Sequence, residues 1–122
     1  MIILSVDDST VIRKVIHNAV CVLGHDFLEA ENGQVALQQL EKHHAEIKLI
    51  LLDWNMPVMD GLATLKAIKT HPIYASIPVM MVTTEAEKGN IALAIQAGAS
   101  NYLMKPFAHE DLLMRMMQTI AS

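Results

Sequence analysis

Cysteine and aromatic residues are scarce in this sequence, whose 122 residues include one Cys, one Trp, two Tyr and two Phe. A single cysteine, Cys21, excludes an internal disulfide and suits a reducing compartment. No apolar run approaches the roughly 20 residues that a membrane-spanning helix needs. Met1 leads directly into an apolar segment without a basic leader, so we expect no secretory signal. These absences predict a cytoplasmic protein with no membrane partner.

Positive charge is also scarce, with nine Lys and Arg residues against 13 Asp and Glu and a formal net charge of −4. A nucleic-acid partner would require a basic face, so we expect none. Apolar residues make up 52% and charged residues 18%, which is typical of a globular chain rather than a disordered one. No repeat and no linker rich in Pro, Gly or Ser divides the chain. The sequence therefore predicts one domain over residues 1–122.

Short, nearly unbroken apolar segments recur along the chain. They occupy residues 2–6, 27–30, 47–52, 77–82 and 102–104. Runs of this length are typical of strands that are covered on both faces.

Segments with apolar residues at helical spacing follow these strands. The first helix is expected between Ser9 as its N-cap and Gly24 as its end. The second follows Asn32, the third begins near Asp60, and the fourth ends at Gly98, with a fifth near the C-terminus. Alternating strands and helices predict an α/β fold with a parallel sheet and helices on both faces.

Polar residues follow the strands at the points where the strands end. They are Asp7, Asp8, Asp53, Thr83, Thr84 and Lys105. Because the carboxyl ends of parallel strands meet at one edge of a sheet, where ligands bind, we expect these side chains to lie together.

The chemistry of this set favours phosphoryl transfer. Neighbouring carboxylates repel one another, and a divalent cation relieves the repulsion. Ligands that are all oxygen favour a hard ion, Mg²⁺ before Zn²⁺. Lys105 supplies a mobile positive charge and Thr83 a hydroxyl donor, while Asp53 is the natural oxygen nucleophile.

Six short motifs occur in a fixed order along the chain. They are Val6-Asp7-Asp8-Ser9, Leu52-Asp53-Trp54-Asn55-Met56-Pro57, Met59-Asp60-Gly61, Val82-Thr83-Thr84-Glu85, Ala97-Gly98-Ala99 and Lys105-Pro106-Phe107. With these motifs the sequence closely resembles the response-regulator receiver domains, and among them the chemotaxis regulators, over essentially its whole length. The resemblance implies a flavodoxin-like (βα)5 fold, a three-layer sandwich around a parallel five-stranded sheet of order 2-1-3-4-5.

The resemblance also implies roles for the acidic residues. Asp53 would accept a phosphoryl group from a sensor histidine kinase. Asp8 and Asp53 would bind Mg²⁺ directly, together with the backbone carbonyl of Asn55, and Asp7 would act through a metal-bound water. The chain would be a phosphoacceptor switch in a two-component system, and not an enzyme beyond phosphorylation and dephosphorylation of its own Asp53.

Further roles follow from the same resemblance. Thr83 and Lys105 would contact the phosphoryl group, and Tyr102 would turn inward when Thr83 shifts. Lys105-Pro106 would be a cis peptide. Asn55 and Glu85 match the positions at which family members tune the rate of dephosphorylation.

The resemblance implies protein partners as well. The fourth helix, fifth strand and fifth helix would form the face that contacts a downstream target. A phosphatase is a further expected partner, and a monomer is the expected state. The sequence ends where the fifth helix should end, which suits a stand-alone regulator, but a receiver excised from a larger regulator would look the same.

Three other functions compete with this prediction. An aspartate-based phosphatase on a similar sheet would need a second Asp two residues after the nucleophile, where this chain has Asn55. A flavin carrier would need a phosphate loop after the first strand, where Asp7 and Asp8 would repel a phosphate. A phosphorylation-independent binding module would not need the full set of three Asp residues, one Thr and one Lys.

Two further expectations concern sulfur-containing side chains. Cys21 follows the apolar stripe of the first helix and is expected to be buried, and Met80, Met81 and Met104 are expected in the core. The three Met residues of the last helix, at positions 114, 116 and 117, cannot all face inward, so at least one should be exposed.

Overall fold

The computed structural model describes residues 1–84 and 89–121. The strands are β1 (Ile2–Val6), β2 (Asp26–Ala30), β3 (Ile47–Asp53), β4 (Val79–Thr84) and β5 (Asn101–Lys105). The helices are α1 (Thr10–Val22), α2 (Gly33–His43), α3 (Gly61–Thr70), α4 (Ile91–Gln96) and α5 (His109–Ala121). All strands pair in parallel in the order β2-β1-β3-β4-β5, which confirms the flavodoxin-like fold expected from the sequence.

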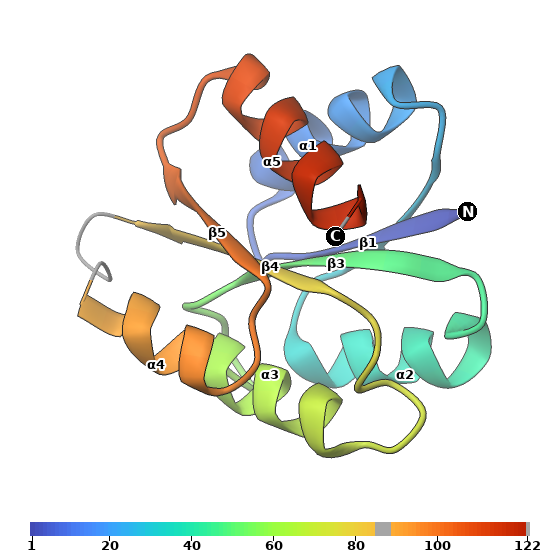
Figure 1. Ribbon diagram of the computed structural model, residues 1–122, viewed down its shortest axis with the longest axis vertical. Helices are drawn as coiled ribbons and strands as arrows, with labels where there is room; N and C mark the ends of the chain where they lie inside the picture. The colour runs from blue at the N-terminus through green and yellow to red at the C-terminus, as the bar shows by residue number, and fades with distance from the viewer. Residues whose placement is uncertain (85–88, 122) are drawn as a thin grey trace.

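The helices cover both faces of the sheet and so complete the three layers. Figure 1 shows α1 and α5 on one face, and α2, α3 and α4 on the other. Side chains of β3 alternate between two apolar cores, with Leu49 and Leu51 in the core beneath α1 and α5, and Ile50 and Leu52 in the other. A strand that is buried on both faces needs apolar residues at successive positions, which explains the unbroken apolar runs.

Side-chain caps fix the starts of three helices close to the strand ends. Ser9 accepts a hydrogen bond from the Ile12 amide, and Asn32 does the same for Val35. Asp60 accepts from the Ala63 amide at 2.8 Å. The sequence predicted Ser9 as the cap of α1, and it placed the starts of α2 and α3 after Asn32 and near Asp60.

The fourth strand differs from its prediction by two residues at each end. It begins at Val79 rather than at residue 77 and ends at Thr84 rather than at residue 82. Pro78 has no amide hydrogen to donate to a sheet, and it immediately precedes the first paired residue. Thr83 and Thr84 are therefore the last two residues of the strand itself.

Two predictions of burial are wrong. Cys21 is exposed, because the buried face of α1 is formed by Ile16, Ala19 and Val20, and each residue turns the helix by about 100°. Met104 is only half-buried, since β5 lies at the edge of the sheet. Met80 and Met81 are fully buried as expected.

The methionines of α5 divide as the helical spacing requires. Met116 is fully buried, whereas Met114 and Met117 are each about half exposed. The expectation of at least one exposed methionine on this helix is confirmed. Within residues 1–84 and 89–121, no helix is both long enough and apolar enough to cross a membrane.

Candidate functional site

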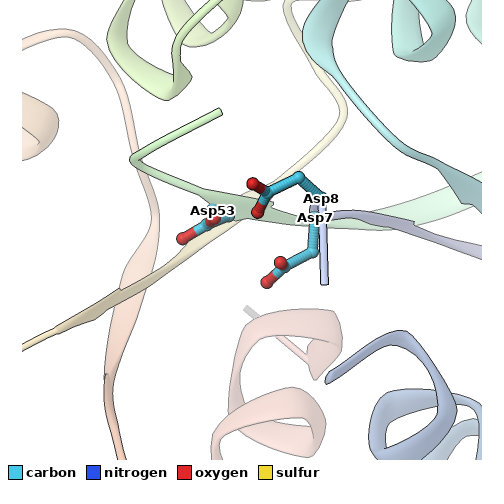
Figure 2. A group of neighbouring side chains, drawn as sticks. All are labelled: Asp7, Asp8 and Asp53. Atoms are coloured by element: carbon cyan, nitrogen blue, oxygen red, sulfur yellow. The ribbon is translucent and has the colours of Figure 1, made fainter. Parts of the chain in front are cut away.

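Three carboxylates converge at the carboxyl edge of the sheet. Asp7 and Asp8 follow β1 directly, and Asp53 is the last residue of the neighbouring strand β3. Each of the three offers a carboxylate oxygen, and these atoms all lie within 4.8 Å of one another (Figure 2). Asp7 and Asp53 are buried, whereas Asp8 is exposed. The sheet thus brings together the acidic residues that the sequence singled out.

Lys105 bridges two of these carboxylates. Its Nζ donates to Asp7 Oδ2 at 3.0 Å and to Asp53 Oδ1 at 3.1 Å. The peptide bond between Lys105 and Pro106 is cis, as the family resemblance implied. Asp7, Asp53 and Lys105 therefore form a single charged network inside the site.

One ammonium group does not balance three carboxylates, and the pKa values reflect this. Burial, followed by the negative charge of Asp7, raises the pKa of Asp53 to about 6 despite the opposing effect of Lys105. Burial acts to lower the pKa of Lys105, but Asp53 and Asp7 outweigh it and the net shift is upward. The site is short of positive charge, and a cation would favour the ionised form of Asp53.

Backbone amides hold the carboxylates in place. The Ser9 amide donates to Asp7 Oδ1 at 2.8 Å, and the Asp7 amide donates to the Ala30 carbonyl at 3.0 Å. The Trp54 amide donates to Asp53 Oδ1 at 2.9 Å. The side chain of Trp54 is half-buried.

Gly61 allows α3 to start against the end of β3. Its amide donates to the Trp54 carbonyl at 2.8 Å. A Cβ atom at position 61 would lie 2.3 Å from the Asp53 carbonyl oxygen, so a larger residue would displace the backbone that carries Asp53. The sequence predicted that a helix begins near Asp60, but it gave no sign of this close approach, which depends on how α3 meets the sheet.

Thr83 carries an unsatisfied hydroxyl on β4, the strand next to that of Asp53. The Cα partner of Asp53 on β4 is Val82, so Thr83 is one residue further along the adjacent strand. Its Oγ1 is fully buried and has no hydrogen-bond partner within the described part of the chain. A buried hydroxyl without a partner costs about 1–3 kcal/mol, which is unusual in a folded protein unless a ligand satisfies it.

Tyr102 lies on β5 and is half-buried. Arg115 of α5 donates from Nη1 to the Tyr102 carbonyl at 3.0 Å, and its Cζ lies 5.0 Å from the centroid of the Tyr102 ring. Asn55 is exposed in the loop after β3. Glu85, the other predicted rate-tuning residue, lies outside the described residues.

The side chains of the cluster fit a hard divalent cation. All their donor atoms are oxygens, and two of the three carboxylates are buried close together, where an added positive charge relieves their repulsion. The Lys105 ammonium, which contacts Asp53, is placed to contact an anionic oxygen next to such a cation, and the neighbouring strand β4 carries the unsatisfied Thr83 hydroxyl.

Comparisons with known proteins agree on one family. Residues 3–117 match the response regulator receiver domain. A protein named chemotaxis protein CheY homolog from Campylobacter jejuni is 42% identical over 113 residues, which cover 92% of this chain and 86% of that protein. Chemotaxis protein CheY1 of Helicobacter pylori is 41% identical over 113 residues, which cover 92% of this chain and 90% of that protein.

Solved structures share the fold over nearly the whole chain. Chemotaxis protein CheY4 of Vibrio cholerae superimposes with a TM-score of 0.87 at 33% identity, covering 97% of each chain. The receiver domain of the sensor histidine kinase PA1611 of Pseudomonas aeruginosa superimposes with a TM-score of 0.87 at 29% identity, covering 99% of this chain and 98% of that one. That receiver domain was crystallised with a magnesium ion coordinated in its active-site cleft.

Proposed function

Because this chain belongs to the response regulator receiver domain family, we propose that it is a phosphoacceptor switch whose acceptor residue is Asp53. Receiver domains of this kind are signalling switches in two-component systems and not conventional enzymes. The observation that carries the proposal is the buried Asp53 carboxylate, which lies within reach of Asp7, Asp8 and the Lys105 ammonium. The proposed domain spans residues 1–122.

The proposed step transfers a phosphoryl group from a histidine of the kinase to Asp53. A carboxylate oxygen of Asp53 attacks the phosphorus of a phosphohistidine in a sensor histidine kinase. The new P–O bond forms as the P–N bond breaks, and the released imidazole takes a proton from solvent. Hydrolysis by water later returns the carboxylate and inorganic phosphate, so the protein acts only on its own Asp53.

The acidic cluster supports a role for Mg²⁺ in this step. Asp8 and Asp53 would bind the ion directly together with the backbone carbonyl of Asn55, and Asp7 would contact it through water. When bound, the ion offsets the negative charge that gathers on the phosphoryl oxygens. Lys105 then supplies a second positive charge from β5, and Thr83 supplies its free hydroxyl as a donor.

Thr83 and Tyr102 form the proposed switch. Thr83 moves to donate to the phosphoryl group, and Tyr102 fills the space that this movement opens. The unsatisfied Thr83 hydroxyl supports this, because a phosphoryl oxygen would give it the partner that it lacks within the described residues. The Tyr102 ring is held near Arg115 of α5, so its movement would also change the surface of that helix.

The proposed output face consists of α4, β5 and α5. Leu93 and Ile95 of α4, together with Met114 and Met117 of α5, are large apolar side chains that are about half exposed. These two helices lie on opposite faces of the sheet, on either side of the edge strand β5 (Figure 1). A surface of this kind suits a protein target, and the similarity to chemotaxis proteins suggests a target in chemotaxis.

A sensor histidine kinase is the upstream partner, a phosphatase could shorten the signal, and a cytoplasmic monomer is the expected state. The net charge of −4 supports the absence of a nucleic-acid partner. We expect no membrane partner either.

The test is phosphorylation by a small donor. The protein is incubated with Mg²⁺ and acetyl phosphate and its intact mass is measured at once, with Asp53→Asn as the control. We expect one added phosphoryl group in the wild type and none in the variant or in the presence of a chelator. If neither acetyl phosphate nor beryllofluoride with Mg²⁺ changes the mass or the fluorescence of Trp54, the phosphorylation-independent binding module becomes the better function.

A further inference from the structure

Arg13, the fourth residue of α1, contacts the acidic cluster through the backbone of Asp7. Its Nη1 donates to the backbone carbonyl of Asp7 at 2.5 Å, and its Nε donates to Glu29 Oε1 on β2 at 2.6 Å. One planar guanidinium thus joins the start of α1 to the ends of two adjacent strands. None of the sequence motifs includes Arg13 or Glu29.

Stability alone is a weak reason for this arrangement. The Glu29 side chain is 53% exposed, and exposed ion pairs contribute little to folding. The Arg13 side chain, in contrast, is only 14% exposed and gives one of its donors to a backbone carbonyl next to the site. Its contact with the main chain of Asp7 is the feature that needs an explanation.

The carbonyl of Asp7 belongs to the peptide that joins Asp7 to Asp8. The Asp7 residue is already held by its amide, which donates to Ala30, and by its carboxylate, which accepts from Ser9 and Lys105. The Asp8 carboxylate is exposed, so its direction depends on the peptide plane that carries it. Arg13 fixes that plane by holding its oxygen.

We propose that Arg13, oriented by Glu29, is a positioning residue for the cation site and sets the separation of the Asp8 and Asp53 carboxylates. This inference rests on the proposed function, in which the acidic cluster binds Mg²⁺. Groups that orient metal ligands in this way typically change metal affinity by about 10–100-fold when they are removed.

The direction in which Mg²⁺ affinity changes distinguishes positioning by Arg13 from the effect of its charge alone. The guanidinium is a positive charge beside the cluster, and as a charge alone it opposes the binding of a cation. Neutralising it would then make Mg²⁺ bind more tightly. Positioning predicts the opposite, because without Arg13 the Asp7–Asp8 peptide can turn and the ligands must be ordered when the ion binds.

The experiment is a Mg²⁺ titration of the metal-free protein, followed by the fluorescence of the single tryptophan, Trp54, and by calorimetry. Arg13→Gln removes both the charge and the planar guanidinium that donates to two partners. Arg13→Lys keeps the charge, but a lysine ammonium cannot reach Asp7 and Glu29 together. The matched control is Lys14→Gln, which removes the same charge from the next, exposed residue of α1. We expect both Arg13 variants to weaken Mg²⁺ binding by about tenfold and the control to leave it unchanged or slightly tighter.

A second pair of variants tests the role of Glu29. Glu29→Gln and Glu31→Gln each remove one negative charge near the end of β2, and both residues are exposed. Only Glu29→Gln should weaken Mg²⁺ binding several-fold, and it should add nothing to Arg13→Gln in the double variant. Both side chains are exposed, so we expect these two variants to fold normally. They therefore test the inference even if Arg13→Gln folds poorly.

Phosphorylation gives an independent readout. At saturating Mg²⁺, Arg13→Gln should reach the same extent of phosphorylation as the wild type, and it should fall behind only when Mg²⁺ is limiting. Wild-type affinity in Arg13→Lys, or tighter binding in Arg13→Gln, would overturn the positioning role while leaving the phosphoacceptor function intact. If the wild type binds Mg²⁺ no better than Asp53→Asn does, the cation site itself is wrong and both proposals fail.

Discussion

Lys105 Nζ lies 3.1 Å from Asp53 Oδ1, although the two residues are 52 positions apart and a whole strand separates β5 from β3. The long lysine side chain reaches across the end of β4 to the carboxylate. The contact shows that the order of the strands and the reach of one side chain together assemble the charged network.

The raised pKa of Asp53 predicts that Asp53→Asn is more stable than the wild type without metal. In the wild type the ionised carboxylate is unfavourable, since burial and then Asp7 raise its pKa from 3.8 to about 6. The folded state therefore binds the proton more tightly than the unfolded state, and stability falls as the pH rises from about 4 to about 6. Asparagine keeps the acceptor for the Trp54 amide and has no charge to bury.

The measurement is urea unfolding in a chelator across this pH range. The two proteins should have similar stabilities near pH 4, and the variant should be more stable by about 2–3 kcal/mol at pH 7. Adding Mg²⁺ should stabilise the wild type and leave the variant unchanged. Equal unfolding midpoints at pH 7 without metal would show that Asp53 carries no burial penalty.

Thr83→Ala should separate phosphorylation from the change that follows it. The variant keeps the Asp53 carboxylate, its acidic neighbours and Lys105, so acetyl phosphate should still modify it. It lacks the hydroxyl that we expect to move, so beryllofluoride should leave the ring signals of Tyr102 in the NMR spectrum largely unchanged. Binding of an activation-dependent partner should weaken in parallel.

Thr83→Ser is the matched control, because it keeps the hydroxyl and removes only a methyl group. It should respond to beryllofluoride as the wild type does. A full Tyr102 response in Thr83→Ala, or equal partner affinity of the two phosphorylated proteins, would show that the hydroxyl does not drive the switch.

The sequence predicted those features that depend on periodicity and on strand ends. Apolar runs located each strand that the structure describes, and polar residues at their ends located Asp7, Asp53 and Lys105. These features are predictable because parallel strands present their ends at one edge whatever the details of packing. The strand order itself came from family resemblance, since spacing alone leaves several orders open.

Features that depend on the rotation of a helix or the direction of one side chain were not predictable. Cys21 continues an apolar stripe in the sequence but lies just past its buried face. The contact of Arg13 with the Asp7 carbonyl joins a side chain to a backbone atom, for which residue types give no signal. The raised pKa of Asp53 depends on burial and separations that only the folded chain sets.

Gly61→Ala should destabilise the protein and disturb the site together. The added Cβ would lie 2.3 Å from the Asp53 carbonyl oxygen and 2.7 Å from Trp54 Cα, and both are backbone atoms that cannot rotate away. We expect a loss of about 2 kcal/mol or more in the free energy of unfolding and weaker Mg²⁺ binding. Gly89→Ala is the control, since no described atom lies within 4 Å of a Cβ added there. Equal stability of both variants would mean that α3 does not press against the end of β3.

Val58→Asn should stabilise the protein, because Val58 occupies the left-handed backbone region at φ 71° in the loop between β3 and α3. A β-branched residue is unfavourable there by about 1–2 kcal/mol, whereas asparagine tolerates this conformation. The valine side chain is 75% exposed, so its replacement loses little apolar burial. Val11→Asn is the matched control at a 69% exposed valine with helical backbone, and it should bring no gain. Urea unfolding should therefore show an increase of about 1 kcal/mol for position 58 alone, and an equal shift in both variants would point to reduced surface hydrophobicity rather than to relieved strain.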